Sequence, residues 1–276
     1  EYYGQILTYL KRSGSDQTVA LNSDVLVNID LNQVFHLHNT TGQKITVVYK
    51  KLPKELISDV NSILEIDESD KVLGHELFQG GDKEVYNMST DIFVVDTPFL
   101  IEKLEEEAAK EEPRKLRYVL RDLAVAENAF AYEYTGYLSN IHSVKAYFDA
   151  NLDMLESQKF YSLFAPNQKV YTKVKNEEPT YYATSSDVKV SQFASGSIVR
   201  GKVNHSVVSR NVDVAEGSSV SHSVLFPRVK VGKGATVEYA IVDKGVEIAD
   251  GVTIRGTENN PVVIKKGSVV TEDIVR

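Results

Sequence analysis

The sequence contains no cysteine and no tryptophan, and it has only two methionines among its 276 residues. Without cysteine the chain can form no disulfide, offers no thiolate nucleophile and builds no cysteine-based zinc site. It also has no apolar run approaching the ~18 residues of a membrane-spanning helix, and its first residues lack the basic and apolar regions of a secretory signal. These absences predict a cytoplasmic protein with no membrane partner.

Positive charge is also scarce, since 31 Lys and Arg stand against 39 Asp and Glu, for a formal net charge of -8. Binding to a nucleic-acid backbone is driven by clustered Lys and Arg that release counterions. We therefore expect no nucleic-acid partner, and any phosphorylated ligand has to be held by local positive charges.

A repeat fills the C-terminal part of the chain, where nine aliphatic residues follow one another in steps of 6, 6 and 5, which sum to a period of 17 residues. Three short straight segments per turn are typical of a parallel β-helix, in which each coil buries one aliphatic residue per side. An antiparallel sandwich is the alternative, but alternating strands do not place nine aliphatics in one such frame. The nine residues are Val208, Val214, Val220, Leu225, Val231, Val237, Val242, Ile248 and Ile254.

Glycines recur at the same period. Gly217, Gly234 and Gly251 are expected at sharp corners, because glycine adopts positive φ without steric cost. An insertion at 258–261 interrupts the frame, and Ile264 and Val270, six residues apart, resume it for a last coil.

The N-terminal part shows α/β patterns instead. Residues 18–21 predict a buried strand that leads to Asp24 at its carboxyl end, the edge at which open α/β sheets bind ligands. A helix capped by Asp30 and a strand over 44–49 follow, which predicts a βαβ unit. Asp24 is therefore a candidate site residue, and the alternative is an ordinary cap or turn aspartate.

Further patterns continue the α/β arrangement up to a segment rich in Lys, Pro, Ser and Tyr. We predict a first domain over 1–158, a linker over 159–190 and a β-helix over 191–276. The additional expected elements are strands at 63–67 and 91–95 and helices at 99–109, 115–123 and 143–155.

Three segments, 21–30, 87–93 and 136–147, resemble the glucose-1-phosphate adenylyltransferase (ADP-glucose pyrophosphorylase) family, specifically its D-type subunit of glycogen biosynthesis. The resemblance implies an α/β nucleotidyltransferase (GT-A/Rossmann-like) domain followed by a left-handed parallel β-helix of hexapeptide repeats, assembled into tetramers. The family's glycine-rich nucleotide loop does not occur in this sequence, so the resemblance also implies that the first domain is N-terminally incomplete.

The family joins ATP and glucose-1-phosphate into ADP-glucose and pyrophosphate, with Mg²⁺ held by two aspartates. Asp24 matches the first aspartate, whereas Asn140 stands at the second and Ser139 replaces the arginine before it. An amide oxygen can coordinate Mg²⁺ but supplies no formal charge. By analogy with lost transition-state electrostatics, one such change costs on the order of 10² to 10³ in rate. The resemblance thus implies an impaired metal site and a vestigial catalytic role for Asp24.

Two further departures concern the sugar phosphate. The family's lysine in a Glu-Lys-Pro motif is missing, and residues 73–78 read Leu-Gly-His-Glu-Leu-Phe instead. Asn87 and Ser89 are the candidates that keep a sugar contact, although such turn-forming residues are often only structural. Asp91 puts a carboxylate where the family usually has an aromatic residue.

Two further sets of side chains are candidate functional groups. Arg114, Arg117 and Arg121 lie on one helical face, which predicts either a solvated face neutralised by nearby glutamates or an anion site for phosphorylated effectors. His205 and His222 are 17 apart and should stack with Tyr239 on successive coils, although histidines on such coils also serve hexapeptide acyltransferases.

Our leading hypothesis is a regulatory, non-catalytic subunit that packs against a catalytic adenylyltransferase subunit and forms homo-oligomer contacts through the β-helix. The alternatives are an active adenylyltransferase in which Asp24 and Asn140 suffice for Mg²⁺, and a hexapeptide acyltransferase that uses His205 or His222.

Overall fold

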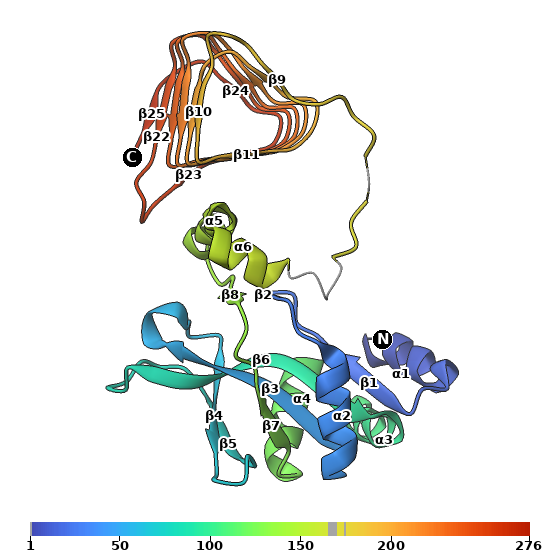
Figure 1. Cartoon of the computed structure of the whole chain (residues 1–276). Helices are drawn as coiled ribbons and strands as arrows, with labels where there is room; N and C mark the ends of the chain where they lie inside the picture. Colours follow the sequence, from blue (N-terminus) through green and yellow to red (C-terminus); the bar gives the residue numbers. More distant parts are fainter. Residues whose placement is uncertain (1, 165–169, 174) are drawn as a thin grey trace. The chain divides into compact units, whose positions relative to one another are not determined.

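A computed structural model describes residues 2–164, 170–173 and 175–276 (Figure 1). The chain divides into two compact units, residues 1–140 and 141–276. This division falls before residue 158, where the sequence analysis ends the first domain. Helix α5 (Val144–Leu152) explains the difference, because its Phe148 is buried against Val224 and Ile241 of the second unit.

The sheet of the first unit is built around β6 (Val85–Asp96). Strand β3 (Ile45–Pro53) runs antiparallel along one side of β6, and β1 (Gln17–Ala20) and β4 (Ser62–Ile66) pair with different parts of its other side. The outer strands are β5 (Val72–Leu77), antiparallel to β4, and β7 (Phe130–Glu133), parallel to β3.

The predicted strand, helix and strand in 18–49 are confirmed as β1, α2 (Leu31–Thr41) and β3. The Asp30 side chain accepts a hydrogen bond from the amide of Asn32, so it caps the helix as expected. β1 and β3 are nevertheless not neighbours, because β6 pairs antiparallel with both and lies between them. A separate ribbon joins β2 (Val25–Val27) to β8 (Leu138–Asn140).

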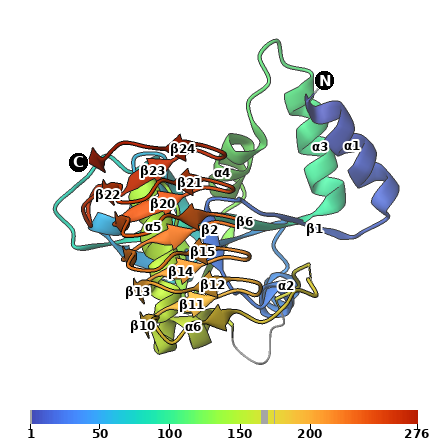
Figure 2. The same ribbon diagram turned by 90° about the horizontal axis from the view of Figure 1, so that it is seen from above.

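Helices cover both faces of this sheet, as the alternation along β3 requires. Ile45 and Val47 belong to a core shared with α1 (Tyr2–Ser13), α3 (Thr97–Ala108) and α4 (Leu116–Ala126), and α1 lies beside α3 (Figure 2). Val48 faces the other way and packs in a core with α2. A short 3₁₀ helix, Lys54–Leu56, follows β3.

The second unit contains a parallel β-solenoid, which appears as a three-sided prism in Figure 1 and as stacked coils in Figure 2. All nine aliphatic residues of the predicted frame are at most 3% exposed, so the frame is confirmed. The solenoid begins at β9, before the predicted residue 191. One side holds β9 (Tyr181–Tyr182), β12 (Ile198–Val199), β15 (Asp213–Val214), β18 (Lys230–Val231), β21 (Glu247–Ile248) and β24 (Val269–Val270).

The other two sides repeat this arrangement. One holds β10 (Asp187–Lys189), β13 (Lys202–Asn204), β16 (Ser219–Ser221), β19 (Thr236–Glu238), β22 (Thr253–Arg255) and β25 (Ile274–Val275). The last holds β11 (Gln192–Phe193), β14 (Val207–Val208), β17 (Val224–Leu225), β20 (Ala240–Val242) and β23 (Val262–Ile264).

The corners and the interruption also follow the sequence prediction. Gly217, Gly234 and Gly251 have φ of 75°, 65° and 73°, the region that glycine adopts most easily. After the insertion at 258–261, Ile264 pairs with Val242 and Val270 pairs with Ile248, so the last coil resumes the frame.

Helices precede the coils in this unit. α5 begins after Ser143, whose hydroxyl accepts from the amide of Ala146 at 3.0 Å, and a 3₁₀ turn, Asp153–Leu155, follows it. The predicted helix over 143–155 is thus confirmed. α6 (Ser157–Leu163) crosses the predicted boundary between the first domain, 1–158, and the linker, 159–190. Within the part of the chain that the structure describes, no helix is both long and apolar enough to cross a membrane.

The stacked core makes one stability prediction. Leu225 is fully buried among the aliphatic residues of the solenoid, so Leu225→Ala leaves a cavity and should lower the free energy of unfolding by about 2–5 kcal/mol. Val269 is 69% exposed, and Val269→Ala should change it by less than about 0.5 kcal/mol. Urea unfolding of both variants checks this, and equal losses would mean that the aliphatic frame does not carry the stability of the coils.

Candidate functional site

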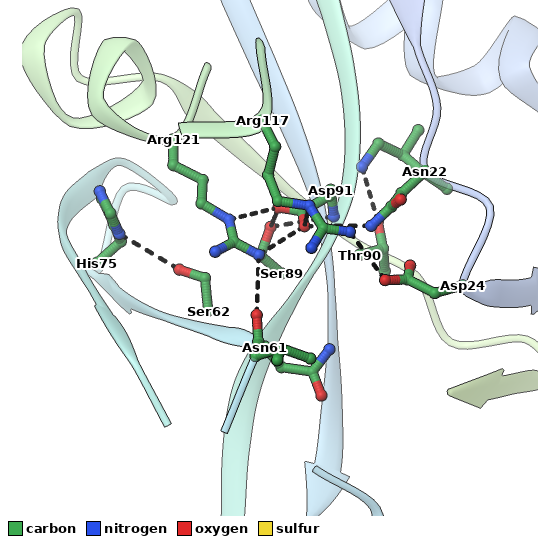
Figure 3. A network of polar contacts seen from close by, with 12 residues as sticks. Asn22, Asp24, Asn61, Ser62, His75, Ser89, Thr90, Asp91, Arg117 and Arg121 are labelled. Carbon is green, nitrogen blue, oxygen red and sulfur yellow. Dashed lines mark hydrogen bonds and ion pairs between the residues drawn. The ribbon is translucent and has the colours of Figure 1, made fainter. Parts of the chain in front are cut away.

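A bulge in β6 places the buried carboxylate of Asp91 in the first unit. In the register with β3, Tyr49 pairs with Ser89 and Val48 pairs with Ile92, so Thr90 and Asp91 have no opposite residues. The Thr90 hydroxyl donates to the Val48 carbonyl at 2.9 Å, and Asp91 has a φ of 53°, which is unusual for a non-glycine residue. The bulge directs the Asp91 carboxylate to α4 (Figure 3).

Arg121 of α4 binds this carboxylate with two parallel hydrogen bonds. Its Nε donates to Oδ1 of Asp91 at 2.8 Å and its Nη2 donates to Oδ2 at 2.6 Å. The side chains are only 2% and 6% exposed, so the two charges neutralise each other away from water. Arg121 also donates to the carbonyl of Val60 at 3.4 Å. Such bidentate pairs are the geometrically specific form of a charged hydrogen bond.

Arg117, one helical turn before Arg121, extends this pair into a chain of alternating charges. Its Nε lies 3.3 Å from Oδ2 of Asp91, and its Nη2 donates to Oδ2 of Asp24 at 2.8 Å. Asn22 adds a contact to Asp91 at 3.4 Å. Asp24 is 30% exposed, and its carboxylate is bound by a guanidinium of its own chain (Figure 3).

The other predicted metal ligand is committed to a different set of contacts. Asn140 pairs with Val25 in the β2–β8 ribbon, so it lies on the strand opposite the residue that follows Asp24. Its side-chain Nδ2 donates to the Leu56 carbonyl and to Oδ1 of Asn61, both at 2.8 Å. The amide of Asn61 donates back to Oδ1 of Asn140 at 3.4 Å. Asn140 therefore holds backbone and side chains together in a buried place.

These residues do not fit a magnesium site. Mg²⁺ in proteins is bound through oxygens, preferably anionic ones, but the Asp24 carboxylate is ion-paired with Arg117 and the Asn140 amide oxygen accepts a hydrogen bond from Asn61. Among the residues that the structure describes, no group of three or more His, Cys, Asp or Glu side chains could hold a metal ion.

The two predicted sugar contacts, Ser89 and Asn87, lie in different surroundings. Ser89 is 2% exposed, and its hydroxyl accepts from the amide of Asp91 at 3.2 Å, so it supports the bulge. Asn87 lines an open groove of about 460 Å³ between β4, β5 and the start of β6. The polar residues of that groove are Glu65, His75, Glu76, Lys83, Tyr86 and Asn87.

Comparison with known proteins agrees with this architecture. Residues 173–275 match the family model described as GlmU-like, C-terminal hexapeptide. Over 96% of its length the chain is 30% identical to the glycogen biosynthesis protein GlgD of Bacillus subtilis, of which it covers 67%. The chain belongs to the family of GlgD and the glucose-1-phosphate adenylyltransferases. The family resemblance of the three sequence segments is thereby confirmed.

Two adenylyltransferases of the family are similar over less of their length. The glucose-1-phosphate adenylyltransferase of Thermosipho africanus is 26% identical over 74% of this chain and 50% of that protein. That of Clostridium acetobutylicum is also 26% identical, over 77% of this chain and 56% of that protein. This member of the family thus spans about half the length of these enzymes.

The arginine face of this family member is not the solvated face that its spacing predicts. Arg121 is buried, and the partners of Arg117 and Arg121 are Asp24 and Asp91 rather than the glutamates of the preceding helix. Only Arg114 follows the expectation, because it contacts Glu107, although it also pairs with Asp122. Asp24 and Asp91 are far from these arginines in the sequence, which is why spacing alone did not find them.

The predicted ladder of rings on the solenoid is confirmed. The ring centroids of His205 and His222 lie 4.9 Å apart, and those of His222 and Tyr239 lie 4.8 Å apart with nearly parallel planes. All three residues have positive φ, of 47°, 43° and 48°, so they occupy one corner of successive coils. Burial, with the adjacent His205, lowers the pKa of His222 and favours its neutral form.

The buried pair predicts a strong asymmetry between the two aspartates. Asp91→Asn leaves the Arg121 guanidinium buried without a counter-charge, which should cost about 3–5 kcal/mol of unfolding free energy. Asp24→Asn breaks a partly exposed pair and should cost less than about 1 kcal/mol. Urea unfolding at neutral pH measures both, and similar losses would show that Asp91 does not anchor α4.

A second prediction concerns acid stability. The hydrogen bond from the Lys110 ammonium, with the contacts of Arg114, lowers the pKa of the buried Glu107 to about 2 from its ordinary value of 4.5. A depressed carboxyl pKa stabilises the native state above the unfolded value near 4.5 and stops doing so as the pH falls toward 2. Wild type should therefore lose stability steeply in that window.

The variant Glu107→Gln should be less stable at neutral pH and show a shallower loss between pH 4.5 and 2, followed by thermal unfolding across the pH series. Glu112→Gln, at an exposed glutamate after α3, is the control and should follow wild type. A Glu107→Gln curve parallel to wild type would contradict the assignment.

Proposed function

We propose that this chain belongs to a regulatory, non-catalytic subunit of a cytoplasmic glucose-1-phosphate adenylyltransferase in glycogen biosynthesis. It would modulate a catalytic partner subunit. The observation that carries the proposal is the binding of Asp24 by Arg117, which leaves the family's first metal aspartate in an internal ion pair. The relation to GlgD, a glycogen biosynthesis protein, supports the pathway.

The second family position supports the same conclusion. An aspartate in place of Asn140 would lose both donated hydrogen bonds and would set a carboxylate against the Leu56 carbonyl. Buried polar groups left without partners are costly. The Asn140 amide thus supports the local fold, and restoring the acid would not by itself rebuild a metal site.

The second unit offers surfaces for assembly. An apolar groove of about 480 Å³ lies between the start of α5 and the solenoid, and its lining includes Val144, Phe226, Ile241 and Val263. Val144 and Val263 are 52% and 43% exposed. Exposed apolar area of this kind is typical of protein interfaces, so it supports contacts with a catalytic subunit or with a second copy of this chain.

Regulation would then work by linkage. A subunit that packs better against one state of its partner shifts the population of that state and changes the partner's affinity for substrates and effectors. Arg114, Arg117 and Arg121 are all ion-paired with carboxylates of their own chain. We therefore propose that phosphorylated effectors act through the assembled enzyme rather than on this arginine face.

The test is an assay of ADP-glucose formation from ATP and glucose-1-phosphate, with the full-length gene product alone and together with the adenylyltransferase of the same organism. Alone it should be inactive, with a rate at least about 10²-fold below that of the partner. Asn140→Asp should not raise that rate. Mixed with the partner, it should change the partner's apparent substrate affinity or its maximal rate.

The variant Val263→Lys puts a charge on the apolar groove and should weaken this effect on the partner, whereas Lys266→Ala, at an exposed position of the same coil region, should leave it unchanged. Substantial activity of the isolated protein that falls with Asp24→Asn would contradict the proposal and identify an enzyme. An unaltered partner would contradict the regulatory role.

A further inference from the structure

We infer that Arg117 is a built-in cation of the Asp24–Asp91 site, and that the site consequently binds no Mg²⁺ or Mn²⁺. The guanidinium lies between the two carboxylates, where a divalent cation would have to lie to contact both. One nitrogen, Nη2, is 2.8 Å from Oδ2 of Asp24, and the adjacent Nε is 3.3 Å from Oδ2 of Asp91. The inference rests on the same ion pair as the proposed function but concerns metal binding itself.

The local charges are balanced without a metal. Two carboxylates, Asp24 and Asp91, face two guanidinium groups, Arg117 and Arg121. A divalent ion added to this set would meet two fixed positive charges at a place where Asp91 is only 6% exposed and solvent screens little.

The fold prepares this arrangement rather than leaving it to flexible side chains. The i, i+4 spacing of Arg117 and Arg121 puts both groups on one face of α4. The bulge at Thr90 and Asp91 fixes one carboxylate, and the bidentate contact with Arg121 prevents it from turning away. Removal of the Arg117 charge would then leave Asp24 without its ion-pair partner, beside an Asp91 carboxylate that Arg121 still neutralises.

The experiment measures Mn²⁺ binding to the whole chain by electron paramagnetic resonance, with Mg²⁺ as competitor. Wild type should show no protein-bound Mn²⁺. Arg117→Met should gain a Mn²⁺ site, with binding at least about tenfold tighter than in wild type, because Asp24 is released and Asp24, Asp91 and Arg121 together then carry a net negative charge. The double variant Arg117→Met/Asp24→Asn should lose the gain. Arg12→Met, at an exposed arginine of α1, is the matched control and should behave as wild type.

Two outcomes would overturn the inference: wild type binding Mn²⁺ in a manner abolished by Asp24→Asn, or a folded Arg117→Met that gains no site. Circular dichroism verifies that the variants fold. If Arg117→Met does not fold, Arg117→Lys takes its place; it keeps the positive charge and should bind no Mn²⁺. Failure of the metal inference is distinguishable from failure of the proposed function, because a wild type that bound no metal but made ADP-glucose would refute only the proposed function.

Discussion

The first unit depends on one buried ion pair, between Asp91 on the central strand and Arg121 on α4. Two charges this poorly exposed are stable only because each satisfies the other with two hydrogen bonds. The pair fixes α4 to the sheet and thereby sets the position of Arg117. Arg117 in turn binds the Asp24 carboxylate, so the buried pair also keeps Asp24 in an ion pair.

The solenoid of the second unit could be predicted from sequence almost completely. A solenoid coil contacts mainly the coils beside it, so its pattern is local and is printed along the chain as a fixed period. Val231 and Ile248 pair across neighbouring coils as the frame requires. What the period did not reveal was where the solenoid begins, because Tyr181 and Tyr182 of the first strand are exposed aromatic residues rather than buried aliphatic ones.

The first unit was predicted less fully, for a physical reason. Strands, helices and the Asp30 cap depend on nearby residues and were found, whereas the insertion of β6 between β1 and β3 depends on pairing across long stretches of chain. The same holds for the site. Arg121 and Asp91 come from different elements, and a signal existed only in the departure of Asp91 from the family pattern.

Two of the predicted site residues, Ser89 and Asn140, make structural contacts. Ser89 supports the bulge, and the Asn140 amide joins Asn61 to the carbonyl of Leu56. Polar side chains in these places are therefore satisfied within the protein. A change toward the enzyme pattern at one position would leave several partners unsatisfied at once, so such positions are coupled rather than independent.

The ring column on the solenoid has a consequence for how substitutions would spread. The ring of His222 lies between those of His205 and Tyr239, which come from the two neighbouring coils. In such a column each ring contacts only the rings of the adjacent coils. A substitution in one coil therefore affects the packing of the adjacent coils and has little effect on coils further away. Single coils of this solenoid can consequently differ in sequence while the stack keeps its shape.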